Sequence, residues 1–246
     1  MTFSRTASED INLFTSPLPI HFTHWRYPHN SSYILSPPEK PNTLKLNPSF
    51  LNLTALNGNY AGALAGPPGG GGGGGQTFIS RRQQDTLFTF RIDASFSLDA
   101  AESEVGVSAF LTQNHHLDLG IVLLSFSSSS PSLVPHVRFR GFSYVPVPAP
   151  VVLPLSELIP GVNSNKGRLD LTFEIRAVNF SHYAFSVGPA GRLSELRTVI
   201  TASNDAVSWG FTGVLLGAYA TRNGGNGTAP AYISKWQYIP EGQFRS

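Results

Sequence analysis

His115 and His116 are followed by Asp118, and these residue types could ligate a metal ion. On an extended strand His116 and Asp118 point to one face and His115 to the other, so only two of the three could bind together. Two protein ligands are fewer than a zinc site needs. We therefore predict no metal centre and no cofactor, and interpret the three side chains as candidate polar contacts to a ligand.

The segment Arg81-Arg82-Gln83 offers forked guanidinium and amide donors that suit sugar hydroxyls or a carboxylate. Trp25, Trp209 and Trp236 are large enough to stack on a pyranose ring, although a tryptophan of a β-sandwich also belongs naturally in the core. The predicted carbohydrate-binding residues are Trp25, Arg81, Arg82, Gln83, His115, His116, Asp118 and Trp209.

A glycosidase needs two carboxylates roughly 5–5.5 Å or 6.5–9.5 Å apart. Asp170 and Glu174 would share one face of a strand but sit roughly 13 Å apart. Glu102 and Glu104 are expected in a loop, and no serine occupies a Gly-x-Ser-x-Gly elbow. We predict no catalytic residue in this chain. Cross-strand pairing leaves one alternative open, among Asp93, Asp118 and Asp170.

The composition excludes several classes of protein. The 246 residues include no cysteine, so disulfides, thiol nucleophiles and cysteine-ligated metals are excluded. The net charge of +2 comes from scattered lysines and arginines, which does not indicate a nucleic-acid partner. No stretch approaches the roughly 18 consecutive apolar residues that would indicate a membrane span.

Alternating apolar and polar residues predict the elements that must position these side chains. Phe88, Phe90 and Ile92 continue as alternate apolar residues to Phe96, and the same pattern runs through 168–177. Such alternation is typical of antiparallel strands with one buried face. Further strands are expected at 43–46, 77–80, 105–111, 117–126, 136–142, 181–187, 192–200, 211–221 and 232–239, with one helical turn at 155–158. The fold class is therefore all-β, with antiparallel strands in a sandwich or a barrel.

We expect a single domain over 11–241, with tails at 1–10 and 242–246. The Gly-rich stretch 66–76 and the Ser-rich stretch 127–131 are expected to be mobile surface loops within it.

The first residues lack the roughly 7–15-residue apolar stretch of a secretory signal. Either the protein stays inside the cell or this chain begins downstream of its true start. Sequons for N-glycosylation favour secretion, at Asn30, Asn52, Asn179 and Asn226.

Several segments, in chain order, resemble the C-terminal concanavalin A-like domain of glycoside hydrolase family 43, the β-xylosidases and arabinofuranosidases. They are residues 12–17 and 24–28 at the start, the strands 33–35 and 44–46, Phe78 to Gln83, Gln113 to Gly120, and 211–224. The resemblance covers about residues 10 to 240 and implies an antiparallel β-sandwich of the jelly-roll kind. The last strand differs, because 231–236 lacks the acidic residues that usually precede its aromatic residue.

The resemblance implies a non-catalytic accessory module, since the catalytic carboxylates of these enzymes lie in a β-propeller that precedes the sandwich. It implies plant cell-wall oligo- or polysaccharides such as xylan and arabinan as partners, a catalytic propeller domain or chain as a second partner, and an extracellular location. Calcium is an option by fold resemblance alone. The alternatives are a glycoside hydrolase with its active site on a concave face, a docking subunit, and a relic without activity.

Overall fold

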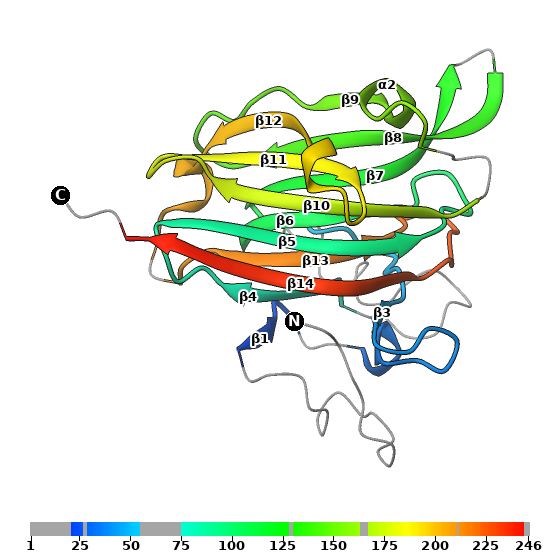
Figure 1. The fold of residues 1–246 in the computed structure, drawn as a ribbon, viewed down its shortest axis with the longest axis horizontal. Coiled ribbons are helices and arrows are strands. Elements are labelled where there is room, and N and C mark those ends of the chain that lie inside the picture. Colours follow the sequence, from blue (N-terminus) through cyan, green and yellow to red (C-terminus); the bar gives the residue numbers. More distant parts are fainter. Residues whose placement is uncertain are drawn as a thin grey trace.

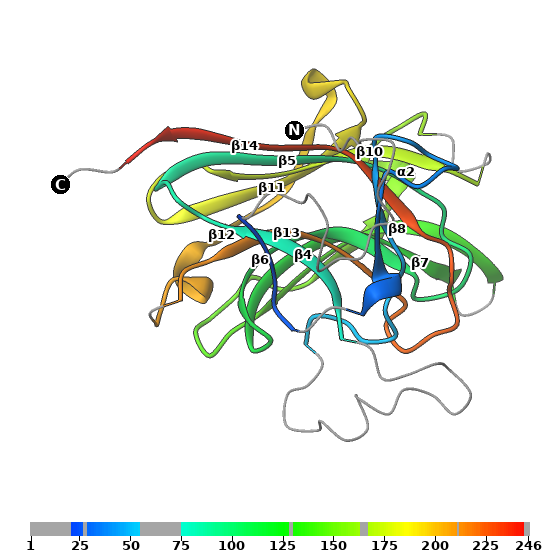
Figure 2. The ribbon, with the colours of Figure 1, turned by 90° about the horizontal axis from the view of Figure 1, so that it is seen from below.

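The computed structural model describes residues 21–26, 29–54, 75–127, 130–162, 167–210 and 212–243. Two antiparallel sheets of seven strands each lie face to face, which confirms the predicted all-β sandwich (Figures 1 and 2). Of the predicted loops at 66–76 and 127–131, residues 66–74 and 128–129 lie outside the described residues. Ser127 and Ser130 belong to strands.

We call the two layers sheet A and sheet B. Sheet A has the strand order β1 (Phe22–His24), β4 (Thr77–Arg82), β13 (Leu215–Thr221), β6 (Glu104–Thr112), β7 (His115–Ser127), β8 (Ser130–Phe142) and β9 (Val151–Pro154). Sheet B has the order β12 (Arg197–Ser203), β11 (His182–Pro189), β10 (Leu169–Ala177), β5 (Leu87–Phe96), β14 (Ala231–Gly242), β3 (Leu44–Leu46) and β2 (Tyr33–Leu35).

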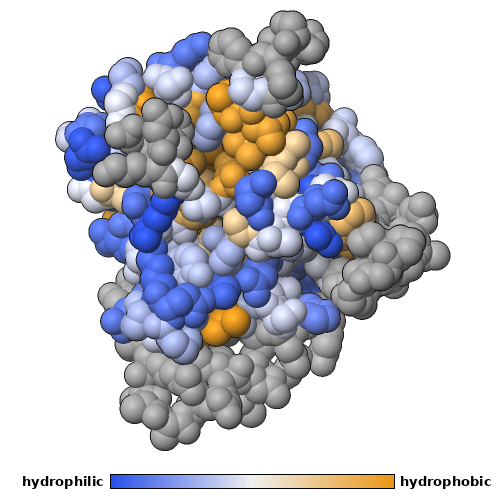
Figure 3. All heavy atoms as spheres, turned by 90° about the vertical axis from the view of Figure 1, so that its right-hand side faces the viewer, coloured by the Kyte–Doolittle hydropathy of each residue, from blue (hydrophilic) through white to orange (hydrophobic). Residues whose placement is uncertain are grey.

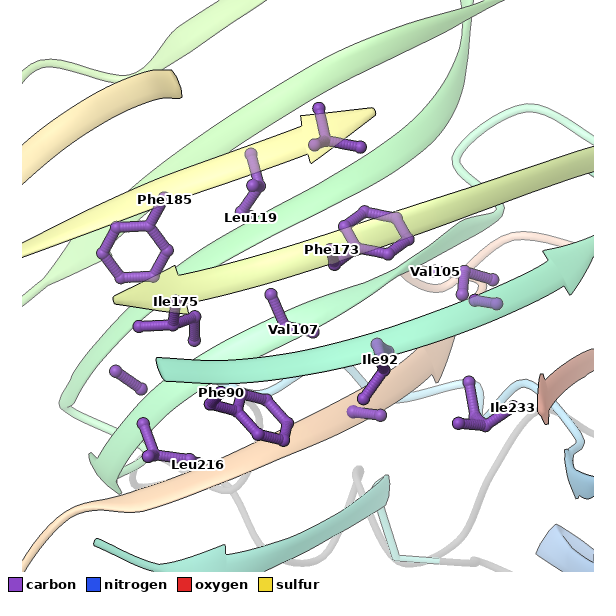
Figure 4. Packing of buried hydrophobic residues seen from close by; sticks show 14 of the residues in the cluster. Phe90, Ile92, Val105, Val107, Leu119, Phe173, Ile175, Phe185, Leu216 and Ile233 are labelled. Carbon is purple, nitrogen blue, oxygen red and sulfur yellow. The ribbon is translucent and has the colours of Figure 1, made fainter. Parts of the chain in front are cut away.

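The core fills the space between the sheets because the alternating residues of each strand point inward together. In sheet B the register sets Phe90 of β5 opposite Ile175 of β10, and Ile92 opposite Phe173. These side chains meet residues such as Val107 from sheet A (Figure 4). The alternation in 88–96 and 168–177 thus correctly identified both strands and their buried faces.

Two predicted strands begin later than expected. Residues 193–195 form a 3-10 turn rather than the start of β12, closed by hydrogen bonds such as that from Leu196 N to Leu193 O (3.3 Å). This turn packs so closely on β11 that a Cβ on Gly188 would lie 2.9 Å from Glu195 O. The next strand begins at Leu215 rather than at residue 211, which lies outside the described residues.

The helical content is small. The predicted turn at 155–158 is present as α2 (Leu155–Leu158), and short 3-10 turns lie at Asn30–Ser32, Leu193–Glu195 and Asn204–Val207, the last labelled η4. Within the described residues, no helix has the length and apolar character required to cross a bilayer.

Candidate functional site

A cavity of about 410 Å³ lies at the end of the sandwich where β14 finishes, and we call it the end cavity. Its walls come from the segments that connect the two sheets at this end (Figure 1). Residues 83–86 join β4 of sheet A to β5 of sheet B, and η4 with the residues after it joins β12 to β13. The cavity therefore brings together side chains that are far apart in the sequence.

Gln83 ties the walls of the end cavity together. Its Oε1 accepts a hydrogen bond from the Tyr183 hydroxyl over 2.6 Å, and its backbone N–H donates to Val214 O over 2.9 Å. Burial raises the pKa of Tyr183 to about 12, so the phenol remains a donor at neutral pH. The side chain of Gln83 thus fixes sheet B against the segment that leads into β13.

Asp85 contributes a carboxylate whose two oxygens are both engaged. The Tyr238 hydroxyl donates to Oδ2 and Gln243 Nε2 donates to Oδ1, each over 3.0 Å. The same phenol oxygen accepts the backbone N–H groups of Gln84 and Asp85, each over 2.9 Å. The guanidinium of Arg81 lies 4.2 Å from the centre of the Tyr238 ring. Asp85 is therefore held in place by its neighbours, with each carboxylate oxygen accepting a hydrogen bond.

Trp209 is the large aromatic side chain of the end cavity and is 47% exposed. Its indole Nε1 donates to His115 Nδ1 over 2.8 Å. His115 is buried, with ring centres 4.3 Å from Trp209 and 4.6 Å from Tyr144. Burial is the largest cause of a lowered pKa of His115, which keeps the imidazole neutral. Nδ1 accepts from the indole in the tautomer that carries the proton on Nε2, and Ser143 Oγ (3.1 Å) and Ala206 O (3.3 Å) lie near the same nitrogen. The indole therefore has a fixed orientation.

Hydrogen-bonding side chains surround this ring at the mouth of the end cavity. Gln84 is exposed, and Asn204 at the start of η4 donates through Nδ2 to Phe180 O over 3.0 Å. Arg82 is exposed beside the end cavity, and its guanidinium donates to the carbonyl of Thr212. The mouth thus combines aromatic surface with amide and guanidinium groups.

The structure brings five of the predicted carbohydrate-binding residues to this end. Gln83 and Trp209 line the end cavity, while Arg81, Arg82 and His115 flank it. Trp25 lies elsewhere, packed edge-on against Phe110 with 5.2 Å between ring centres. Sequence reasoning missed Asn204, Tyr238 and Gln243, because only the folded connections bring them to the cavity.

His116 and Asp118 lie on the outer face of sheet A and are fully buried. His116 Nδ1 is 2.9 Å from Asp118 Oδ1, which also accepts the Ser108 hydroxyl over 2.7 Å. The imidazole stacks near Phe110 and Phe142. With Ser108, this pair belongs to a row of buried polar side chains on sheet A, which we call the polar row. The pair does not join His115 at the end cavity.

Glu104 belongs to the same polar row and forms ion pairs with two arginines. The sequence predicts it in a loop, whereas it is the first residue of β6. Its carboxylate is buried and accepts Arg138 Nη2 over 2.5 Å, Arg140 Nη2 over 3.0 Å, and the Tyr219 hydroxyl over 2.8 Å. Burial alone would raise the pKa of Glu104, but the two arginines outweigh burial and hold it below its usual range.

The remaining carboxylates predicted to allow cross-strand pairing lie on sheet B, away from Asp118. The register sets Asp93 opposite Thr172 and Asp170 opposite Ser95. Asp93 accepts the Thr172 hydroxyl over 2.5 Å, and Asp170 accepts Arg168 over 3.2 Å. Neither lines the end cavity. Across the described residues, no three acidic or histidine side chains converge as a metal site would require.

The opposite end of the sandwich differs in chemistry. It faces the viewer in Figure 3, where apolar residues gather on the surface. A hollow of about 250 Å³ there is lined by Leu98, Leu123, Leu133, Val134, Pro135, Gly167 and Leu169. A smaller hollow of about 160 Å³ on sheet B also carries polar side chains, from Ser95, Ser97, Arg168 and Tyr232. The end cavity has the largest volume of the three hollows.

Comparisons with known proteins agree with this fold. Residues 14–239 match the family described as the beta xylosidase C-terminal concanavalin A-like domain. No protein with a curated description matches the chain.

Several solved structures share the fold. A Bacteroides ovatus structure titled "Xyloglucan PUL GH43B" is 23% identical with a TM-score of 0.61, over 90% of this chain and 36% of that chain. The xylan beta-1,4-xylosidase from Bacillus halodurans C-125 is 16% identical with a TM-score of 0.63, over 95% of this chain and 40% of that one.

A Saccharomyces cerevisiae protein of unknown function is 12% identical with a TM-score of 0.53, over 86% of this chain and 98% of that chain. The chain thus spans 36–40% of the length of the two bacterial structures and nearly all of the yeast one. The match over residues 14–239 shows that the chain belongs to the family of beta-xylosidase C-terminal concanavalin A-like domains.

Proposed function

We propose that this chain is a non-catalytic module that binds plant cell-wall pentose polysaccharides, such as xylan or arabinan, beside the catalytic part of a family 43 glycoside hydrolase. The observation that carries the proposal is the half-exposed Trp209 ring among amide side chains at the mouth of the end cavity. Because these polysaccharides are outside cells, the proposal also places the protein there.

The chemistry of the end cavity suits a neutral sugar. A sugar ring presents apolar C–H surface to an aromatic ring and a girdle of hydroxyls to polar groups. Trp209 offers the aromatic face, and the amides of Gln84 and Asn204 add hydrogen-bonding groups. Gln84 Oε1 already accepts from Arg81, and Asn204 Nδ2 already donates to Phe180 O. The second lone pair of Gln84 Oε1, its Nε2 and the second Asn204 N–H are therefore the groups that a sugar hydroxyl would use. Asp85 is the one carboxylate among the described lining residues, and both its oxygens are already engaged. Glycoside hydrolysis by paired carboxylates needs two, so this lining supports binding over hydrolysis.

A docking role is the second candidate, supported by apolar side chains next to the same site. Tyr144 is 79% exposed and packs on His115, and Val145 beside it is also exposed. These residues and Trp209 would give a catalytic propeller domain or chain an apolar surface to contact. Mixing this chain with a separately expressed family 43 propeller, followed by size-exclusion chromatography, tests this role. Co-elution that Tyr144→Ser abolishes would support docking, and separate elution would exclude it for that propeller.

The first experiment is affinity electrophoresis of the purified chain through xylan, arabinoxylan, arabinan and polymer-free gels. We expect retardation in at least one pentose polymer, and Trp209→Ala should remove it. Leu193→Ala is the matched control, because Leu193 is similarly exposed (45%) and does not line the end cavity. Equal migration of the unmodified chain in every gel would reject polysaccharide binding by this chain alone.

A further inference from the structure

The tip of the β10–β11 hairpin is an exposed loop, residues 178–181, closed by the hydrogen bond from Val178 N to His182 O over 3.0 Å. Phe180 is 59% exposed and Val178 is 40% exposed, so the residues on either side of Asn179 are apolar and partly exposed to solvent. Asn179 is itself exposed. Together with Ser181 it forms one of the four N-glycosylation sequons of the chain.

The carboxamide of Asn179 has one engaged end and one open end. Its Oδ1 accepts from the backbone N–H of Ser181 over 2.9 Å and from the Ser181 hydroxyl over 3.0 Å. Its Nδ2 donates no hydrogen bond to the residues that the structure describes. The nitrogen that would carry a glycan is therefore available on the exposed loop.

The other sequons differ in their surroundings. Asn52 is half-buried between the buried side chains of Leu51 and Leu53, and its backbone carbonyl accepts Gln76 Nε2 over 2.9 Å. A bulky oligosaccharide on Asn52 would have to emerge across packed surface. Asn226 is exposed in the loop before β14, where Asp99 holds the backbone N–H and hydroxyl of Thr228 over 2.9 Å. The side chain of Asn30 lies outside the described residues.

We propose that Asn179 is an N-glycan attachment site, that exposed Asn226 is a second one, and that Asn52 remains unmodified. The co-reactant is a polyprenyl-diphosphate-linked oligosaccharide. Nδ2 forms a bond to C1 of its first sugar while the C1–O bond to the diphosphate breaks. The diphosphate leaves with the electron pair, and Nδ2 gives up one proton. The inference rests on the extracellular location within the proposed function, but not on polysaccharide binding.

An oligosaccharide on Asn179 would begin beside the end cavity. Phe180 lines that cavity, and the Asn204 side chain fixes the loop to η4 through the Phe180 carbonyl. The first sugar could also cover the exposed Phe180 ring, because an aromatic side chain offers apolar surface to a sugar. The glycan would then limit the directions from which a polysaccharide chain can reach Trp209.

The test is expression of the full chain behind a secretion leader in a eukaryotic host, with glycans released by peptide:N-glycosidase F in ¹⁸O-water. Peptide mass spectrometry should find ¹⁸O-labelled aspartate at positions 179 and 226, and unlabelled asparagine at 52. Asn179→Gln and Ser181→Ala should each remove one glycan, whereas Ser181→Thr should retain it and serves as the matched control. Digestion of the total cell extract gives the same readout for any variant that is not secreted.

Unmodified Asn179 in a chain that carries a glycan at another sequon would overturn the proposal. Occupied Asn52 would overturn the distinction drawn from burial. The two proposals fail separately: glycosylated Asn179 in a protein that no polymer retards would reject polysaccharide binding and support the attachment site. Retardation of a chain in which Asn179 is unmodified would support polysaccharide binding and reject the attachment site.

Discussion

His115 accepts, through Nδ1, the hydrogen bond that the indole N–H of Trp209 donates over 2.8 Å. An indole nitrogen can only donate, so this bond exists only while Nδ1 carries no proton. The neighbouring Tyr144 ring contacts the same imidazole at 4.6 Å between ring centres. The orientation of the exposed ring in the end cavity thus depends on a buried side chain that can titrate.

Acidification should weaken polysaccharide binding through His115. Burial lowers its pKa below the usual 6.5, so the folded protein keeps the imidazole neutral where the unfolded chain already takes up a proton. The free energy of unfolding should therefore fall as pH drops below 6.5, and the bond to Trp209 should break as pH passes through the lowered pKa. Gel retardation and the difference in tryptophan emission between the unmodified chain and Trp209→Phe, each followed from neutral pH downward, measure this.

His115→Asn is the control, because an asparagine can accept from the indole without titrating. It should bind independently of pH in this range. An identical pH profile for His115→Asn and the unmodified chain would assign the effect to another group.

Replacing Glu104 by Gln should destabilise the fold strongly. Arg138 and Arg140 would lose their buried counterion, and breaking such a pair typically costs about 3–5 kcal/mol. Glu102→Gln is a matched control, because Glu102 also contacts Arg138, over 3.0 Å, but its side chain is 43% exposed. Its loss should cost less than about 1 kcal/mol. Urea unfolding of the three proteins measures both values, and equal costs would contradict the central role of Glu104.

The lowered pKa of Glu104 gives the same network a dependence on pH. Its stabilisation is fully present above the usual pKa of 4.5 and should be lost as pH falls below 4.5 through the lowered value. In Glu104→Gln that part of the acid sensitivity should disappear from the urea unfolding curves. A variant as acid-sensitive as the unmodified chain would point to other carboxylates.

Gly120→Ala should destabilise the fold through this network as well. A Cβ at position 120 would lie 2.5 Å from the Tyr219 hydroxyl oxygen and 2.7 Å from Glu104 Oε1. Overpacking of this kind typically costs about 1–3 kcal/mol. Tyr219→Phe removes one of the two clashing atoms, so Gly120→Ala should cost less in that background. A double-mutant cycle by urea unfolding checks this, and strictly additive costs would show that the two positions are not coupled.

Truncation should separate the roles of two tryptophans. Trp25 packs on Phe110 within a cluster that includes Leu53, Phe78 and Tyr219. Trp25→Ala should lower the free energy of unfolding by up to about 3 kcal/mol, the low end of the range for a core tryptophan, because Trp25 is half-buried. Trp209→Ala should cost about 0.5–1.5 kcal/mol, the value of one hydrogen bond, and should abolish gel retardation. Unfolding midpoints and electrophoresis on both variants test this. Retardation lost in folded Trp25→Ala but kept in Trp209→Ala would move the binding site to the outer face of sheet A.

Much of the fold could be predicted because alternation records burial directly. Phe88 to Phe96 and the neighbouring strand β10 each turn their apolar residues into the core, so polar and apolar residues alternate cleanly along both. The short strand β9 gave no comparable pattern, since its four residues include a proline and mostly half-buried side chains. The strand predicted at 192–200 included residues 193–195, because the apolar Leu193 fitted the alternation, but these residues form a 3-10 turn.

The candidate site could be predicted only in part. Residue chemistry pointed to Gln83 and Trp209, but Asn204 and Gln243 join them only because η4 and the end of β14 lie at the same end of the sandwich. The sequence also places Glu104 in a loop and Asp118 among the ligand contacts, although both side chains are buried on the polar face of β6 and β7. A strand pattern distinguishes the two faces of a sheet and does not reveal whether the polar face is covered.

The end cavity has one further consequence, because its walls belong to both layers of the sandwich. Gln83 and Val214 continue strands of sheet A, whereas Tyr183 and Gln243 belong to sheet B or its continuation. A ligand bound among them would contact both sheets, so it would bind the folded protein and not the unfolded chain. Saturation to a hundred times the dissociation constant would add about 2.7 kcal/mol to the unfolding free energy. The rise in melting temperature could then be used to screen candidate sugars without an activity assay.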